Sequence, residues 1–343
     1  MQTERIIGIL ESKIKVKKYQ IHIFKQDNVM SIRDNPYYFY ESPVRPQIRK
    51  LGTIACDRVE ATPVVFRDRL YRFEYYRPGE SNEENEGNPS CFRFVDVGSG
   101  ALTPSFAENC HLGCAFADGD TMYAVGVRGT WGGDTLSFFR SEDLAHWNTY
   151  DVRFEGLSCF NTGICEKDGV YTLLIEVSDA VPFTFRFARS QDMENWELLP
   201  DTYAFQKDRY AGGPAICTLP GDPYYYVLYL EAYPGPCYAN CIARSKNLAE
   251  WEYSPINPVL MFNEREDKQI ANPFLTPHER ERIRRALDIN NSDMELCEFN
   301  GRTVIYYSWG NQRGIEFLAE AAFEGTKKEF LTAYFERPTQ NRR

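Results

Sequence analysis

The amino-acid sequence predicts an all-β fold, a five-bladed β-propeller, and two repeated patterns carry the prediction. The first pattern reads Arg-Ser-x-Asp/Asn-Leu/Met-x-x-Trp and occurs three times, at residues 140–147, 189–196 and 244–251. Each copy follows a short apolar run that is typical of a strand, and the spacing between copies is near 50 residues. A period of that length with several strands per unit is typical of propeller blades.

The second pattern is a β-hairpin that recurs along the chain. Each instance has a strand, a polar turn that contains Gly or Asp, and a second strand that opens on Tyr or an apolar residue. The turns at 117–120, 167–169 and 299–301 carry Asp-Gly or Asn-Gly, which favours a tight hairpin. The five instances are 60–66 with 70–76, 111–116 with 122–128, 161–165 with 170–176, 212–219 with 224–231, and 293–297 with 303–309. Five hairpins imply five blades.

The residues of the first motif explain its local structure. Its Ser and its Asp or Asn favour a polar turn, because these side chains accept hydrogen bonds from nearby backbone groups. Trp147, Trp196 and Trp251 would then fill the gaps between neighbouring sheets. We therefore interpret the three tryptophans as structural residues.

We expect one domain over residues 1–343, with blades at roughly 55–105, 106–155, 156–205, 206–262 and 288–335. The first ~50 residues fit the repeat less well and offer an extra strand to close the ring. A short helix over residues 276–287 is expected before the last blade. Thr276 suits its N-cap, Pro277 its first turn, and Glu279 completes a capping box.

Composition limits the partners and the compartment. The formal net charge is −10, the pI is about 5.1 and no basic stripe occurs, so we expect no nucleic-acid partner. No run of roughly 18 apolar residues occurs, so we expect no membrane span. The N-terminus has no apolar signal core, which indicates a soluble cytoplasmic protein, or a periplasmic or secreted one if a signal peptide has been removed. The Cys pairs 110/114 and 237/241 lack zinc-site spacing, so no metal site is predicted.

The propeller geometry predicts where functional residues gather. The innermost strand of each blade lines the channel, so the starts of the first strands and the ends of the second strands should meet at one mouth. The starts hold Asp57, Glu60, His111, Asn161, Tyr210, Asp293 and Glu295, and the ends hold Tyr76, Arg128, Glu176, Glu231 and Trp309. Carboxylates can perform acid–base chemistry and aromatic faces can stack on sugar rings. We therefore predict a carbohydrate site in the funnel.

Cleavage of a glycosidic bond uses two carboxyl groups, one protonated and one ionised. Carboxylates that crowd together away from water push their pKa values apart, which supplies these two roles. The predicted catalytic residues are Glu60, Asp293, Glu231 and Glu176. The predicted substrate-binding residues are Arg58, Tyr76, His111, Arg128, Asn161, Glu295 and Trp309.

Several of these candidates also have a purely structural interpretation. Glu60 could pair with Arg58 at a strand edge, and Asp293 could be a turn residue after the preceding helix. Arg128 could serve only to neutralise a carboxylate, and His111 could be a hydrogen-bonded wall residue of the channel.

These features resemble the five-bladed propeller glycosidases. The resemblance covers roughly residues 55–335 and rests on the Ser-x-Asp-Leu-x-x-Trp repeats, the acids at the inner strands, and the Gly212-Gly213-Pro214 turn. Glycoside hydrolase families 43, 32, 117 and 130 belong to this group, and the chain matches no single one of them closely. Family 43 enzymes begin the first inner strand with Asp-Pro, where this sequence has Glu60-Ala61-Thr62-Pro63.

The leading hypothesis is a glycoside hydrolase that acts on a small oligosaccharide or a glycan terminus with inversion and without a cofactor. One alternative is a glycoside phosphorylase, with Arg58, Arg128 or His111 forming an anion subsite beside the acids. Another is a non-catalytic carbohydrate-binding or scaffold propeller, whose channel acids would be paired with Arg or Lys and leave no open pocket. A metal-dependent lyase or lactonase is a further alternative, and the channel carboxylates would also suit a structural calcium ion.

Overall fold

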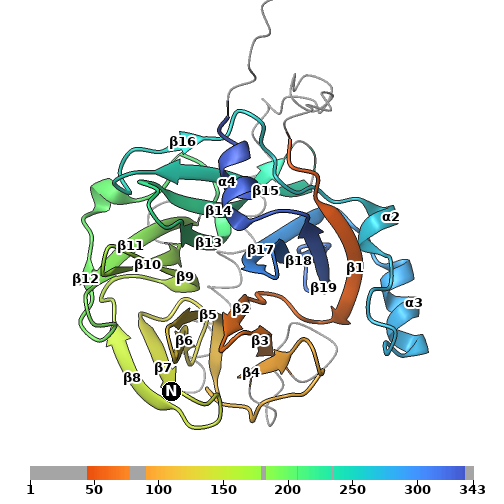
Figure 1. Ribbon diagram of the computed structural model, residues 1–343, viewed down its shortest axis with the longest axis horizontal. Helices are drawn as coiled ribbons and strands as arrows, with labels where there is room; N and C mark the ends of the chain where they lie inside the picture. Colours follow the sequence, from red (N-terminus) through yellow and green to blue (C-terminus); the bar gives the residue numbers. More distant parts are fainter. Residues whose placement is uncertain are drawn as a thin grey trace, which may run out of the picture.

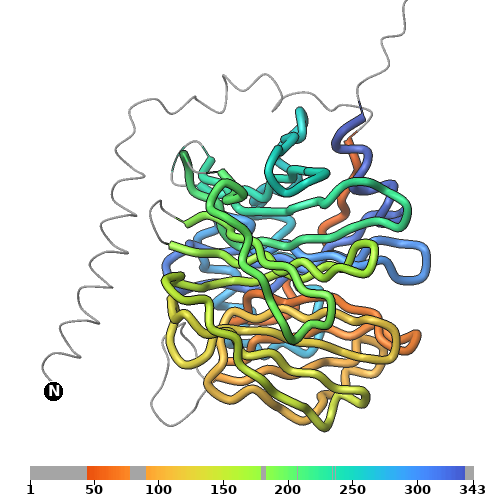
Figure 2. The backbone as a smooth tube through the Cα atoms, turned by 90° about the vertical axis from the view of Figure 1, so that its left-hand side faces the viewer, coloured from red at the N-terminus to blue at the C-terminus, as the bar shows by residue number. Residues whose placement is uncertain are grey.

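The computed structural model describes residues 45–77, 90–178, 183–206, 208–233, 235 and 237–336. These residues form a five-bladed β-propeller, in which antiparallel sheets surround a central axis (Figure 1). The inner strands contact one another in a closed cycle of β2, β5, β9, β13 and β17. Seen from the side in Figure 2, the strands run roughly along the axis, so their connections gather at two opposite faces. The predicted fold class is confirmed.

The blades follow the order of the chain. The first contains β2 (Pro63–Phe66), β3 (Arg69–Tyr76) and β4 (Cys91–Asp96), and the second contains β5 (Cys110–Asp118), β6 (Thr121–Arg128), β7 (Thr135–Ser141) and β8 (Asn148–Arg153). The third contains β9 (Cys159–Lys167), β10 (Val170–Val177), β11 (Thr184–Ser190) and β12 (Glu197–Leu198), followed by the 3-10 turn η2 (Asp201–Tyr203). The fourth contains β13 (Gly212–Thr218), β14 (Tyr225–Tyr233), β15 (Cys237–Ser245) and β16 (Glu252–Tyr253).

The fifth blade joins the two ends of the described chain. It contains β17 (Asn290–Phe299), β18 (Arg302–Gly310), β19 (Glu316–Phe323) and β1 (Arg49–Cys56). β1 pairs antiparallel with β19, from Arg49 opposite Ala322 to Cys56 opposite Phe317. The ring is therefore closed by hydrogen bonds between segments that lie far apart in the sequence (Figure 1).

The repeated tryptophans pack between blades. Trp147 stacks on Phe106 with ring centroids 3.9 Å apart, and Trp196 stacks on Phe138 of the preceding blade at 5.4 Å. Trp251 lies over Phe187 of the preceding blade at 5.8 Å. Such aromatic contacts bury large apolar surfaces, so the structural interpretation of these residues is confirmed.

The polar turn before each tryptophan forms as predicted. In the copy of the second blade, Ser141 Oγ accepts a hydrogen bond from the backbone of Leu144 at 2.9 Å, and Asp143 Oδ1 accepts one from His146 at 2.8 Å. The Leu or Met of each motif has a left-handed backbone, with φ of 62° at Leu144 and 65° at both Met193 and Leu248. One local conformation is therefore repeated in three blades.

The described residues include three helices: α2 (Glu264–Asp267), α3 (Pro277–Arg285) and α4 (Lys327–Ala333). α2 and α3 lie beside β1 at the outer edge of the ring (Figure 1). α3 precedes the last blade, and Thr276 and Glu279 form the expected capping box. The helix ends at Arg285, two residues before the predicted end, because Ala286 has extended backbone angles. None of the helices that the structure describes has the length and apolar character to cross a membrane.

Candidate active site

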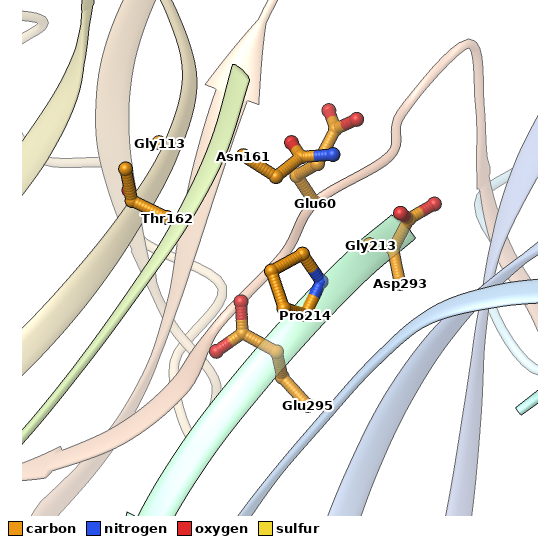
Figure 3. Close-up of a pocket in the computed structure, with 8 residues that line it drawn as sticks. All are labelled: Glu60, Gly113, Asn161, Thr162, Gly213, Pro214, Asp293 and Glu295. Carbon is orange, nitrogen blue, oxygen red and sulfur yellow. The ribbon is translucent and has the colours of Figure 1, made fainter. Parts of the chain in front are cut away.

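A pocket opens at the axis, where the inner strands of the five blades begin. Its empty volume is about 220 Å³. The side chains and glycines around it come from all five blades: Glu60, Gly113, Asn161, Thr162, Gly213, Pro214, Asp293 and Glu295 (Figure 3). Three carboxyl groups that are distant in the sequence therefore face one cavity.

β-bulges direct these residues at the cavity. The register of β5, β13 and β17 shifts near the start of each strand, between His111 and Cys114, Gly212 and Ala215, and Ser292 and Glu295. A fourth shift occurs in β10 opposite the start of β9. A bulge leaves one or two residues unpaired and turns their side chains out of the normal alternation. The pocket residues of four blades lie in or beside these bulges.

The two acids at the pocket mouth have unusual backbone angles. Glu60 has φ of 48° and Asp293 has φ of 49°, both in the left-handed region. Asp tolerates this region moderately, whereas Glu visits it rarely, and such a conformation costs on the order of 1–3 kcal/mol. Strain of this kind is concentrated at functional sites.

Gly213 lets the backbone of β13 lie very close to the Asp293 side chain. Its φ is +52°, and a Cβ atom added there would lie 2.4 Å from Asp293 Oδ1. At Gly212 a Cβ atom would lie 2.5 Å from the Tyr210 hydroxyl and 3.1 Å from Glu176 Oε1. The Gly-Gly turn therefore makes room for two carboxyl groups and a phenol.

Asp293 accepts a hydrogen bond that favours its ionised form. The Ser292 hydroxyl donates a hydrogen bond to Asp293 Oδ2 at 2.8 Å. Burial raises the pKa of Asp293, and this hydrogen bond and the positive charge of Arg77 oppose the rise. The negative charge of Asp293 in turn raises the pKa of Glu60, Glu176 and Glu295.

Glu60, in contrast, lies in surroundings that favour its protonated form. Its Oε2 atom is buried and has no hydrogen-bond partner in the described part of the chain. Burial raises the pKa of Glu60 well above its ordinary value, and the charge of Asp293 raises it further. Because an uncompensated buried carboxylate is unfavourable, Glu60 keeps its proton to higher pH than Asp293 does.

Burial also raises the pKa of Glu176 and that of Glu295, each to about 8. Glu176 lies behind the lining residues. Its Oε2 accepts hydrogen bonds from Asn161 Nδ2 at 2.9 Å and from the backbone of Gly213 at 3.0 Å. Glu295 lines the pocket and accepts a hydrogen bond from the Thr62 hydroxyl at 3.0 Å. The position of Glu176 thus suits a residue that orients the pocket wall.

Arg58 and Tyr76 lie on the first blade, beside the segment that carries Glu60. The Arg58 guanidinium lies over the Tyr76 ring, 4.3 Å from its centroid. His111 lies deeper in the wall, where Nδ1 is 2.9 Å from the Tyr75 hydroxyl and Nε2 is 3.1 Å from the Gly129 carbonyl. These contacts hold the imidazole inside the wall, outside the set of residues that line the pocket.

Three second-strand residues do not join the site, so the expected convergence of all five strand ends is wrong. Arg128 is bonded to Asp151 on the outer strand β8 at 3.0 Å. Glu231 is paired with Arg209 at 3.0 Å. Trp309 is fully buried within the fifth blade, where its ring stacks on Phe317 at 4.5 Å.

The reason for this difference is the length of the hairpins. Glu176 lies opposite the bulge of its blade, and the equivalent positions in the second, fourth and fifth blades are Gly126, Tyr229 and Tyr307. The number of paired residues between the hairpin turn and the bulge differs among the blades. The sequence-based prediction aligned the second strands by the residues that follow the hairpin turn. That alignment selected Arg128, Glu231 and Trp309, each of which lies two residues beyond the position opposite the bulge.

Sequence reasoning also missed several residues. Gly113 and Thr162 line the pocket, and Arg77 lies close enough for its charge to lower the pKa of Glu60 and of Asp293. A glycine inside a strand pattern is a signal of a bulge or a close approach, so Gly113 was open to detection. Nothing in the local sequence distinguishes Arg77 from the other arginines of the first blade.

In the described ranges, no cluster of three or more His, Cys, Asp or Glu side chains is arranged to hold a metal ion.

The chain was compared with known proteins. No protein family and no curated protein matches it. A solved glycoside hydrolase is 12% identical over 81% of this chain and 92% of its own, with a TM-score of 0.56. An alpha-L-arabinofuranosidase from Podospora anserina, in complex with cellotriose, is 10% identical over 82% of this chain and 98% of its own, with a TM-score of 0.54. A glycoside hydrolase family 32 beta-fructofuranosidase from Bombyx mori is 13% identical over 89% and 66%, with a TM-score of 0.53. The chain therefore has the five-bladed β-propeller fold of these glycoside hydrolases, and the resemblance noted in the sequence is confirmed at the level of the fold.

Proposed function

We propose that the chain is a glycoside hydrolase that binds the terminal residue of a small oligosaccharide or glycan in this pocket. The observation that carries the proposal is the pair Glu60 and Asp293, two carboxyl groups that face one cavity and differ in their tendency to ionise. The shared fold supports the same class of activity.

The ionisation order assigns a role to each acid. Asp293, as the ionised base, takes a proton from water while the water oxygen attacks the anomeric carbon. Glu60, as the acid, donates its proton to the glycosidic oxygen as the bond between that oxygen and the anomeric carbon breaks. The single displacement inverts the anomeric configuration. Activity should fall at low pH, where Asp293 is protonated, and at high pH, where Glu60 loses its proton.

A non-catalytic scaffold fits the site less well. That alternative expects channel acids paired with Arg or Lys and no open pocket. None of Glu60, Glu176, Asp293 and Glu295 is joined to a basic side chain by an ion pair within the ranges that the structure describes. Keeping four acids together without such partners is costly, which favours a role in chemistry.

Replacement of Glu60 tests the proposal. In Glu60→Gln the general acid is lost, so hydrolysis of a natural glycoside should fall by about 10²–10⁴-fold. An aryl glycoside with an acidic phenol needs little protonation and should be affected much less. The measurement is kcat/KM over a panel of aryl glycosides with the same sugar and phenols of different acidity. The alkaline limb of the pH profile should also disappear.

The matched control is Glu252→Gln, a change in an exposed carboxylate that pairs with Arg244 on the outer edge of the fourth blade. It should leave kcat/KM unchanged for every substrate. Equal losses in Glu60→Gln for acidic and weakly acidic phenols would refute the role of Glu60. Failure of the wild-type protein to cleave any glycoside of a broad panel would refute the proposed function.

A further inference from the structure

Asn161 lines the pocket and carries a hydrogen-bond acceptor without a partner. It lies near the start of β9 and belongs to the same set of lining residues as Glu60 and Asp293 (Figure 3). Its Oδ1 atom is buried and has no hydrogen-bond partner in the described part of the chain. Buried polar atoms of native proteins are nearly always hydrogen-bonded, because an amide oxygen held away from water without a donor is unfavourable. A donor on a molecule in the pocket would satisfy this oxygen.

Glu176 sets the orientation of the Asn161 amide. It lies in β10, at the bulge opposite the start of β9. Asn161 Nδ2 donates to Glu176 Oε2 at 2.9 Å, and the backbone N–H of Gly213 donates to the same oxygen at 3.0 Å. A backbone N–H can only donate, so this carboxyl oxygen acts as an acceptor. The amide nitrogen of Asn161 therefore faces Glu176, and its Oδ1 is turned away from that carboxyl group.

This arrangement holds in both protonation states of Glu176. Burial raises the pKa of Glu176 to about 8. A proton on this carboxyl group belongs on Oε1, since Oε2 already accepts two hydrogen bonds. The contacts to Asn161 and Gly213 thus require an acceptor oxygen and do not require a group that gives or takes protons. They also join the third blade to the fourth, because Gly213 begins β13 with its neighbour Gly212.

We propose that Asn161 determines specificity by accepting a hydrogen bond from one hydroxyl group of the bound sugar, and that Glu176 is the positioning residue that holds its amide for this contact. The inference deepens the proposed function and rests on it for the ligand being a sugar. A ring that carries hydrogen or fluorine in place of that hydroxyl group leaves Asn161 Oδ1 unpaired and is discriminated against. Glu176 then acts through Asn161 and not on the bond that breaks.

Binding of free monosaccharides tests the assignment without any cleavage. Saturation-transfer NMR with D-glucose, D-galactose, D-mannose, D-xylose and L-arabinose should show that at least one binds the wild-type protein. At least one monodeoxyfluoro derivative of that sugar should bind at least about tenfold more weakly, because fluorine replaces a donor by a group that cannot donate. In Asn161→Leu the parent sugar and this derivative should bind equally, which assigns the preference to Asn161.

Two substitutions of Glu176 test the positioning role. Glu176→Met removes the acceptor, so the preference for the parent sugar over the fluorinated derivative should be lost. Glu176→Gln supplies an amide oxygen that can accept the same two hydrogen bonds, so the preference should be kept. The matched control is Glu197→Met, a change in an exposed glutamate of β12 in the same blade, and it should also keep the preference.

The variants are compared only if their circular dichroism and Tm match those of the wild type, and Asn161→Leu with Glu176→Gln decides if Glu176→Met does not fold. Binding of none of the five sugars would overturn the inference. So would a full preference in Asn161→Leu or in folded Glu176→Met, or its loss in Glu176→Gln. Cleavage of glycosides by a protein without this preference leaves the hydrolase and removes the inference. The preference in a protein that cleaves no glycoside does the reverse.

Discussion

Asp293→Asn is expected to reduce kcat/KM by about 10²–10⁴-fold, the loss typical of removing a general base. Asparagine has nearly the same shape as aspartate and adopts the left-handed backbone at least as readily, so the φ of 49° at this position is preserved. The loss should therefore arise from the missing charge. The residual activity should no longer show the acidic limb that protonation of Asp293 causes.

The same variant has a readout that needs no substrate. In the wild type, the charge of Asp293 contributes to the rise of the Glu295 pKa to about 8. Removing a negative charge favours ionisation of neighbouring carboxyl groups, so the pKa of Glu295 should fall in Asp293→Asn. Carboxyl carbon NMR titration of glutamate-labelled protein measures this shift.

Asp168→Asn is the matched control, because Asp168 is an exposed hairpin-turn residue whose φ is also left-handed, at 54°. It should retain full activity and an unchanged Glu295 titration. If Asp293→Asn keeps wild-type kcat/KM on a substrate of the wild-type protein, Asp293 is not the base.

Lys50→Met is expected to destabilise the fold by about 3–5 kcal/mol, the usual cost of breaking a buried ion pair on one side. Lys50 Nζ contacts both carboxylate oxygens of Asp267, at 2.8 and 3.0 Å, and also donates to Asn291 Oδ1 at 2.7 Å. The two charged side chains are only 5% and 0% exposed. The substitution leaves the Asp267 carboxylate without its counter-charge and loosens the strand that closes the ring.

The neighbouring residue supplies the comparison. Arg49 pairs with Glu324 at 3.2 Å, but these side chains are 61% and 69% exposed. Arg49→Met should therefore change the free energy of unfolding by less than about 1 kcal/mol. Urea unfolding curves of both variants measure the difference, and equal midpoints for the two would contradict the importance of the buried pair.

The fold was predictable because its signals are local. The turn before Trp147, Trp196 and Trp251 is made by side chains that bond to backbone groups within three residues. Such contacts depend only on contiguous sequence, so three copies of the motif identified the blade period. The pairing of β1 with β19, by contrast, joins residues more than 260 positions apart, and no local pattern shows that partner.

The site was predictable only in part. Glu60, Asn161, Asp293 and Glu295 were found because the start of an inner strand must face the axis, and the structure brings these four into one pocket. Arg128 and Trp309 were misplaced because the position of a β-bulge sets which residue faces the axis. A shift of register moves a side chain along the strand or to its other face, and the bulges here depend on packing between blades.

The structure of Asp293→Asn crystallised with a cleavable oligosaccharide would examine the site most directly. A sugar ring should occupy the pocket, with the glycosidic oxygen within about 2.6–3.2 Å of a Glu60 carboxyl oxygen and the anomeric carbon facing residue 293. Inversion further requires the two carboxyl groups to be about 6.5–9.5 Å apart in the wild type, to admit a water molecule. A sugar bound elsewhere on the propeller, or with its glycosidic oxygen beyond the reach of both Glu60 and residue 293, would contradict the proposed site.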